Sequence, residues 1–448
     1  MAHRQEGRKI AENTGFLYYR NAAACPSADA GWDLQYADPE HAAALARNAV
    51  DSVDALLRGW AALTLAAYWQ KNGQSQPAAL MLARARRSFA AAGHARGTWL
   101  TAALEATQAL AAGDVTAALT RAEGLLAHPP PTGHELDLHH IHQVLSFCHK
   151  RLGNIEGGLR WLYTDLALVR EHQARPQQAV VLLNLAAYLM RIEEWPEAKA
   201  CLLEAATLAA ALPNGSLLRR IDLNLALCAR ALNDREEALQ LTRRALADPE
   251  CDPGSTYSLY GNAAALHVQM GDLDAARTTL AEAWAVARAG GLPIELAECH
   301  CIDGQIAAAE GRIDAAVAAL ETSALIAKRV SDVHAPVQTT ILRLLADYLA
   351  RRGDTQRAYA IHQRFFAANE ARHEYMQRAR LFAARARHEV ETMRLERDQA
   401  RVLQQQREAT QRAIGALNAR LGARAAEIEA LRAQLQEQAD HGRQPRTR

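Results

Sequence analysis

The chain has 448 residues, a formal net charge of +1, and 50% apolar but only 5% aromatic residues. This length predicts several domains or one long repeat array. The balanced charge argues against a protein that mainly neutralises nucleic-acid phosphates or an anionic membrane. A composition rich in alanine and poor in aromatic residues favours helices packed closely on helices over a β-sandwich or barrel.

The sequence shows no export or membrane signal. The first 15 residues are polar and charged, and no apolar stretch approaches the ~18 residues that cross a bilayer. The seven cysteines are an odd number without a disulfide-like framework, in a chain long enough to form its own core. We therefore expect a cytoplasmic protein that binds neither a membrane nor a nucleic acid.

After an N-terminal segment, residues 1–37, a turn pattern recurs along the chain. It consists of a residue that is usually Gly or Asn, usually a polar residue next, and in most cases an alanine five positions after the first. The intervals between its eight occurrences are 40, 40, 40, 40, 38, 40 and 42 residues. The first residues of the turns are Gly73, Gly113, Gly153, Glu193, Asn233, Gly271, Gly311 and Gly353.

Other positions keep the same period. A small residue lies seven positions before each turn, at Ala66, Ala106, Ser146, Ala186, Ala226, Ala264, Gly304 and Ala346. A larger apolar residue follows nine positions after several turns, and prolines mark the joints between units. This pattern predicts pairs of helices that approach closely at the small residues, each pair covered by the next.

The small residue, the turn and the alanine resemble the tetratricopeptide repeat, and Asn184-Leu185-Ala186 is similar to its Asn-Leu-Gly segment. The usual unit is ~34 residues, and the longer period here resembles the repeat region of the maltose activator MalT. The resemblance covers residues 38–370. It implies an all-α fold, a right-handed superhelical array of about eight helical hairpins.

In that family the first helices line a concave groove, and the Asn of this segment often bonds the backbone of a peptide ligand. Carried over to this chain, the resemblance implies groove contacts from Asn184, Asn224 and Asn262. Nearby arginines are suited to bind a ligand carboxylate, namely Arg191, Arg220 and Arg230. The alternative is that the asparagines only bond neighbouring helices.

The sequence predicts one long helix over residues 371–440. From Ala371 to the end the chain has 16 arginines and no lysine against 10 acidic residues, a net charge of +6. A heptad seam occupies its second half, at Ile414, Leu417, Leu421, Ile428, Leu431 and Leu435. We expect this seam to form a weak parallel homodimer through a coiled coil, the alternative being a solvated single helix.

The same segment is similar to linkers between tetratricopeptide arrays and GGDEF diguanylate cyclase domains. The phrase Leu435-Gln-Glu-Gln-Ala439 carries this likeness, and a basic tail, residues 441–448, that we expect to be disordered follows it in place of a catalytic domain. We expect a non-catalytic sensory or protein-interaction scaffold that binds a peptide, protein or small ligand in the groove and relays binding through the coiled coil. The alternative is the regulatory half of a truncated diguanylate cyclase.

The rest of the sequence offers few candidates for a metal site or a catalytic site. His139 and His142 are spaced to share a helical face within a cluster of histidines, but no strong ligand motif closes a metal site there. Cys299 and Cys301 fall on nearly opposite faces of a helix. No nucleophile motif, phosphate loop or pair of carboxylates stands in a supporting context, so we expect no enzyme activity, no metal and no cofactor.

Overall fold

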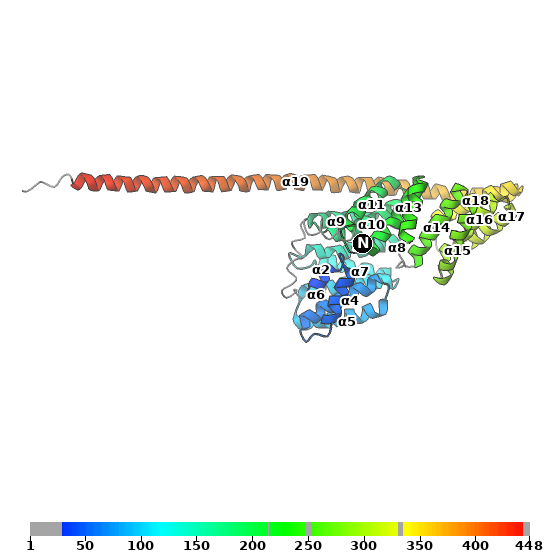
Figure 1. Cartoon of the computed structure of the whole chain (residues 1–448), viewed down its shortest axis with the longest axis horizontal. Coiled ribbons are helices and arrows are strands. Elements are labelled where there is room, and N and C mark those ends of the chain that lie inside the picture. The colour runs from blue at the N-terminus through cyan, green and yellow to red at the C-terminus, as the bar shows by residue number, and fades with distance from the viewer. Residues whose placement is uncertain (1–28, 214, 247–252, 330–334, 442–448) are drawn as a thin grey trace, which may run out of the picture. The chain divides into compact units, whose positions relative to one another are not determined.

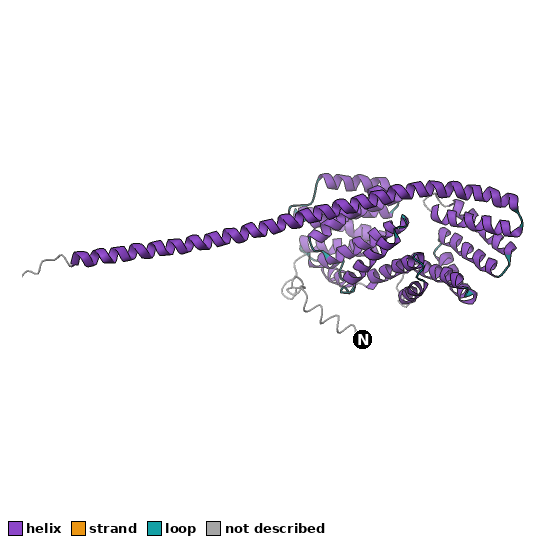
Figure 2. Cartoon of the chain, turned by 90° about the horizontal axis from the view of Figure 1, so that it is seen from above, coloured by secondary structure: helices purple, strands orange, loops and turns teal. Residues whose placement is uncertain are grey.

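The computed structural model describes residues 29–213, 215–246, 253–329 and 335–441, which are helices and connecting loops without a β-strand (Figure 2). Contacts divide the chain into two compact units, residues 1–386 and 387–448. Most of the predicted N-terminal segment, and the predicted tail except His441, lie outside the described residues. None of the described helices is long and apolar enough to cross a membrane.

Among the described residues, eight helical hairpins follow one another, and the second helix of the last hairpin continues beyond residue 386 (Figure 1). Their first helices are α4 (Ala55–Lys71), α6 (Ala95–Ala111), α8 (Leu138–Arg151), α10 (Arg175–Arg191), α12 (Gly215–Ala231), α14 (Pro253–Met270), α16 (Pro293–Ala309) and α18 (Ala335–Arg352). Their second helices are α5 (Ser75–Ala92), α7 (Val115–Ala127), α9 (Ile155–Glu171), α11 (Trp195–Ala209), α13 (Arg235–Leu246), α15 (Leu273–Ala289), α17 (Ile313–Arg329) and α19 (Thr355–His441). The all-helical repeat fold predicted from the sequence is thus confirmed.

Each predicted turn contains a residue with a left-handed backbone. All eight first residues of the turns have a positive φ, from +60° at Glu193 to +90° at Gly353. At the third turn the Asn154 amide donates to the His149 carbonyl at 2.9 Å, and Asn154 Oδ1 accepts a hydrogen bond from the Gly157 amide at 2.9 Å. One helix therefore ends and the next begins within three residues, which explains the Gly followed by a polar residue.

The small residues lie where the two helices of a unit meet. All eight residues seven positions before the turns are buried. At Gly304 an added Cβ would stand 3.2 Å from the Ala316 carbonyl oxygen in the second helix of the same unit. The small residues therefore allow the close approach that the sequence predicts.

Successive first helices touch one another at α4–α6, α6–α8, α10–α12, α12–α14, α14–α16 and α16–α18. No comparable contact joins successive second helices among the described residues. The first helices therefore line the concave side of the array, which we call the inner face. Two helices precede the array, α2 (Ala30–Leu34) and α3 (Pro39–Ala49), and both contact neighbouring helices at its N-terminal end.

The second unit is the continuation of α19 beyond residue 386. Nearly all of its described side chains are exposed. The six residues of the predicted seam each expose more than half of their surface, from 52% at Ile428 to 66% at Leu435. In the single chain this apolar seam is therefore uncovered.

Candidate functional site

The short segment that contains α2 lies across part of the inner face. Arg96, at the start of α6, lies 3.3 Å from Asp29 Oδ2. The Trp32 ring is centred 6.2 Å from the Trp60 ring in α4 and 5.1 Å from the His140 ring in α8. The segment thus contacts the first helices of three consecutive units.

Lys71, the last residue of α4, lies next to this segment. Its Nζ donates a hydrogen bond to the Gln35 carbonyl oxygen at 2.8 Å and stands 4.2 Å from the centre of the Tyr36 ring. Lys71 as a residue is exposed, but protein atoms surround its ammonium group. This desolvation, with a smaller effect of the Arg220 charge, lowers the pKa of Lys71 to about 7.

Four cations on first helices form what we call the basic cluster: Lys71, Lys150, Arg191 and Arg220. Burial lowers the pKa of Lys150, and the charges of Arg191 and Arg220 lower it further. Because Arg220 acts on both lysines, the four charges share one electrostatic neighbourhood. Within the described residues Lys71, Lys150 and Arg191 have no ion-pair partner, and Arg191 Nε is buried without a hydrogen-bond acceptor.

The three predicted asparagines occupy equivalent positions but differ in exposure. Asn184 is 8% exposed and donates to Gln143 Oε1 at 2.6 Å. Asn262 is 3% exposed and donates to Thr242 Oγ1 at 3.2 Å. Asn224 is half-buried. The first two bond neighbouring helices, and Asn224 is the most accessible of the three.

The predicted arginines separate into two places. Arg191 and Arg220 belong to the basic cluster. Arg230 lies near Glu298 of α16, and burial lowers the pKa of Arg230 although the Glu298 charge opposes this change. Burial also raises the pKa of Glu298, whose Oε2 accepts a hydrogen bond from the Tyr257 hydroxyl at 3.0 Å. The Glu298 carboxyl group is thus close enough to Arg230 to act on its charge.

A buried polar network that the sequence did not reveal lies beneath the inner face. His139 Nδ1 is 3.0 Å from Asp165 Oδ2, and His142 Nδ1 is 3.5 Å from Asp165 Oδ1. Gln143 also donates to Asp165. Burial alone would raise the pKa of Asp165, but the charge and hydrogen bond of His139 outweigh it, and the net shift is downward.

We next consider whether these histidines are placed to bind a metal. No three His, Cys, Asp or Glu side chains of the described residues are placed to hold a metal ion. Cys299 and Cys301 are buried free thiols, and burial raises the pKa of each to about 12. Such thiols stay protonated near neutral pH, which makes them poor ligands and nucleophiles.

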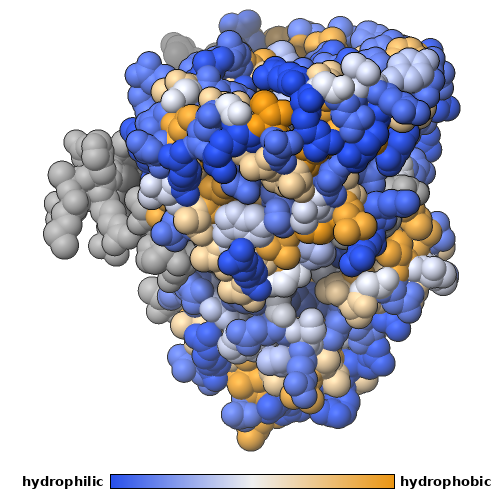
Figure 3. Space-filling model, turned by 90° about the vertical axis from the view of Figure 1, so that its right-hand side faces the viewer, coloured by the Kyte–Doolittle hydropathy of each residue, from blue (hydrophilic) through white to orange (hydrophobic). Residues whose placement is uncertain are grey.

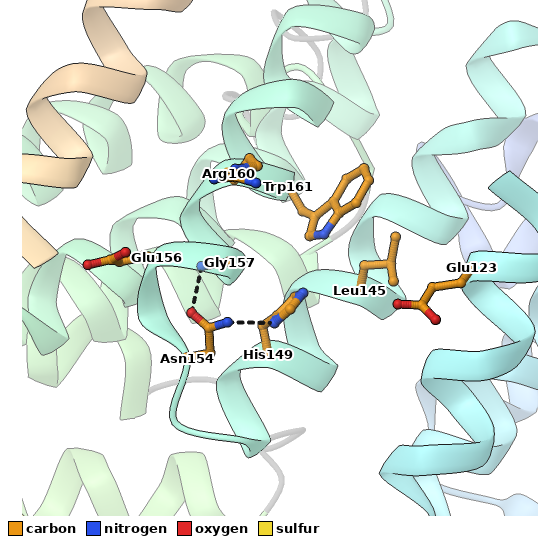
Figure 4. A pocket seen from close by; sticks show the side chains of 8 residues that line it. All are labelled: Glu123, Leu145, His149, Asn154, Glu156, Gly157, Arg160 and Trp161. Atoms are coloured by element: carbon orange, nitrogen blue, oxygen red, sulfur yellow. Dashed lines mark hydrogen bonds between the residues drawn. The ribbon is translucent and has the colours of Figure 1, made fainter.

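A separate surface pocket of about 300 Å³ lies between α7, α8 and α9 (Figure 4). Trp161, Leu145 and His149 form part of its lining. The Asn154 side chain is occupied by its hydrogen bonds to Gly157 and to His149 Nδ1, the latter at 3.2 Å. The lining contains no Ser, Cys, Thr or Lys that could serve as a nucleophile.

Two residues of the basic cluster, Lys71 and Lys150, were not among the candidates from the sequence. They are two of only five lysines in a chain whose positive charge is nearly all arginine. Both stand near the C-terminal ends of first helices, where a cation also interacts favourably with the helix dipole. This rarity was the only feature in the sequence that could have marked them.

No protein-family model and no curated protein matches the chain. Its structure is similar to a Rap protein complexed with Competence and Sporulation Factor (12% identity, TM-score 0.55, covering 78% of this chain and 98% of that chain). It is also similar to the Rap conjugation gene regulator of the plasmid pLS20 in complex with a Phr peptide (14% identity, TM-score 0.50, 78% and 93% covered).

A third similar structure is a tetratricopeptide repeat protein from Parabacteroides merdae, with 14% identity and a TM-score of 0.39, covering 64% of this chain and 97% of that chain. At identities this low, the likeness concerns the fold. The array has a helical fold similar to that of the two Rap proteins.

Proposed function

We propose that this tetratricopeptide-like array is a non-catalytic scaffold whose inner face binds an acidic peptide or an acidic segment of a protein. The observation that carries the proposal is the basic cluster, in which Lys71, Lys150 and Arg191 have no ion-pair partner among the described residues. Cations that are partly desolvated and repel one another are unfavourable until an anion joins them.

The chemistry of the cluster favours carboxylates. Arg191 has a buried Nε without an acceptor, and guanidinium groups bind carboxylates through two parallel hydrogen bonds. Asn224 lies in α12, the helix that also holds Arg220, and supplies an amide for a peptide backbone. Asn184 and Asn262 would then support this surface from beneath, and Arg230 would lie beside it.

The solved structures support a peptide as the ligand class. The similar Rap protein is complexed with Competence and Sporulation Factor, and the pLS20 regulator with a Phr peptide. On the end of the molecule that Figure 3 shows, hydrophilic residues predominate and apolar ones lie among them, several of them across the middle of the face.

A fluorescein-labelled decapeptide of glutamate tests this function by fluorescence anisotropy, with Gly-Ser and lysine decapeptides as controls. We expect the glutamate peptide alone to bind at low salt. Arg191→Ala with Arg220→Ala should weaken binding by roughly 100-fold, because each charged hydrogen bond contributes about 1.5 kcal/mol. Arg87→Ala, on the second helix α5, is the matched control and should leave affinity unchanged.

Affinity should also fall as the pH rises from 6 to 8, because Lys71 loses its charge near pH 7. Lys71→Arg should remove this dependence, since arginine stays charged. Equal affinity for the glutamate and Gly-Ser peptides would contradict the proposal.

The relay through the C-terminal helix rests on the seam and on the resemblance to linkers of GGDEF proteins. Leaving such side chains in water is unfavourable by roughly 1.5–3 kcal/mol for each one that pairing would fully bury. We expect a weak parallel dimer in the micromolar range by sedimentation, and a monomer after truncation following Thr410.

The point variant Leu421→Glu should also give a monomer. Leu395→Glu places the same charge on an exposed leucine of the same helix that lies off the seam, and should leave the dimer intact. A full chain that stays monomeric at high concentration would exclude this relay. The regulatory half of a diguanylate cyclase remains the second reading, and it would use the same seam to bring two catalytic domains together.

A further inference from the structure

The first part of α19 leaves the last unit and then contacts units three and four. Ala358 packs in the core formed by α16, α17 and α18, and no residue between it and Met376 is buried. Beyond that point Met376, Ala379 and Ala383 are buried again, each at most 5% exposed. The helix therefore runs from the eighth unit to a second docking place in the middle of the array.

Polar contacts fix this docking place at two turns. The Tyr375 hydroxyl donates to the Gly153 carbonyl oxygen at 2.6 Å, at the third turn. At the fourth turn Arg380 Nε donates to the Ile192 carbonyl oxygen at 2.8 Å and lies 3.0 Å from Glu194 Oε1.

Glu193 at the fourth turn pairs with two arginines of α19. Arg372 forms an ion pair with Glu193 Oε1, and an Arg380 nitrogen lies 3.7 Å from Glu193 Oε2. Six of the other turns have Gly at this position and one has Asn, whereas Glu193 holds φ at +60°, which is unfavourable for a residue with a Cβ. The turn residue that binds α19 is thus neither Gly nor Asn, unlike the residue at each of the seven other turns.

The helix acts as a chord across the array. From Thr355 to Arg372 it covers 17 residues, or about 26 Å at 1.5 Å per residue, and joins unit eight to unit four. Because an α-helix is stiff over this length, the chord fixes the spacing of units four to eight. Any change in the curvature of those units must therefore stretch or break the contacts at Glu193 and Gly153.

The docking place adjoins the basic cluster. Burial raises the pKa of Tyr375, and the nearby Arg191 charge opposes this increase. Arg191 therefore stands close both to the proposed ligand site and to the residues that hold α19. In addition, Ala379 and Ala386 fall on the line of every seventh residue that continues to Ile414 and Leu421. Docking therefore covers only the part of this line up to Ala386, and Met393, Ile414 and Leu421 on the same line stay exposed.

We propose that residues 372–386 form a releasable latch on the third and fourth turns, and that occupancy of the inner face changes its engagement. The latch itself follows from contacts between residues that all lie within 1–386. The coupling to a ligand rests on the proposed function.

Methionine oxidation tests the latch directly. Met376 is 5% exposed and Met393, on the same helix, is 54% exposed, so Met393 serves as an internal reference. With dilute hydrogen peroxide and peptide mass spectrometry on the full chain, we expect Met376 to be oxidised at least tenfold more slowly than Met393. Equal rates would overturn the proposal.

Glu193→Gly is the informative variant, because it removes the ion pairs yet restores the residue that most turns use. We expect Met376 oxidation to accelerate at least fivefold while the melting of the array is unchanged or higher. Asn233→Gly makes the same change at the fifth turn, where φ is +65°, and should leave the Met376 rate unchanged. A Met376 rate that Glu193→Gly does not alter would overturn the latch.

The coupling is measured by adding the labelled glutamate decapeptide. Its anisotropy reports binding independently, so a failure to bind counts against the proposed function and leaves the latch result in place. With the peptide bound, we expect the Met376 rate to change by more than twofold. An unchanged rate at saturation would overturn the coupling.

Discussion

Replacing Asp165 by alanine is expected to lower the free energy of unfolding by about 3–5 kcal/mol, the usual cost of removing one partner from a buried charged network. Asp165 is fully buried, and His139 and His142 beside it are at most 5% exposed. Without the carboxylate, the His139 imidazole and the Gln143 amide lose their acceptor, and His142 loses the carboxylate 3.5 Å from its Nδ1, in a place that water does not reach.

Urea denaturation followed by circular dichroism measures this loss. Asp303→Ala, which removes an exposed aspartate from the middle of α16, is the control and should stay within about 0.5 kcal/mol of the parent. If the two variants have the same stability, the buried network does not hold α8 to α9.

The pH dependence of the same variant follows from the lowered pKa of Asp165 in the folded chain. A carboxyl whose pKa is lower when folded contributes stability that is complete above its unfolded pKa, about 3.9, and is lost as the pH falls through the folded value. We therefore expect the gap between parent and Asp165→Ala to be largest at neutral pH and to narrow below pH 4.

Gly158→Ala is expected to destabilise the chain by about 1–3 kcal/mol, as overpacking of a close-packed core does. Gly158 stands where most other units have alanine, so the repeat pattern by itself predicts a gain. An added Cβ, however, would overlap the Tyr188 hydroxyl oxygen, and Tyr188 is itself buried and bonded to the Ser146 carbonyl.

The matched control is Gly124→Ala within the helix α7, where nothing lies within 4 Å of the new Cβ. That change should stabilise by about 0.5–1 kcal/mol, because alanine loses less backbone freedom on folding. Thermal melts of the two variants should move in opposite directions. An increase in the melting temperature of both variants would mean that the Tyr188 side chain moves aside at little cost in free energy.

The features that repeat were predictable from the sequence. A left-handed residue at each turn and a small residue seven positions earlier are local requirements, so each unit must meet them again. The uninterrupted helix after Thr355 was predictable for a similar reason, because no proline or glycine occurs before Ile414.

Contacts that occur once were not predictable. Glu193 appeared only as an irregular turn residue, since its partner Arg372 lies 179 positions away. Asp165 and His139 belong to the two helices of one unit, but no other unit has such a pair to make it visible as a pattern. Asn184 matched the motif of its family, and only the contact with Gln143 revealed how deeply it is buried.

The chord made by α19 also restricts how the gene for such an array can change. Open solenoids gain and lose whole units by duplication and deletion, because each unit contacts only its neighbours. Here a unit of about 40 residues inserted or removed between Glu193 and Thr355 would shift one end of the chord but not the other, and Arg372 would no longer meet its carboxylate. We therefore expect a change in the number of units in this part of the chain to break the docking of α19.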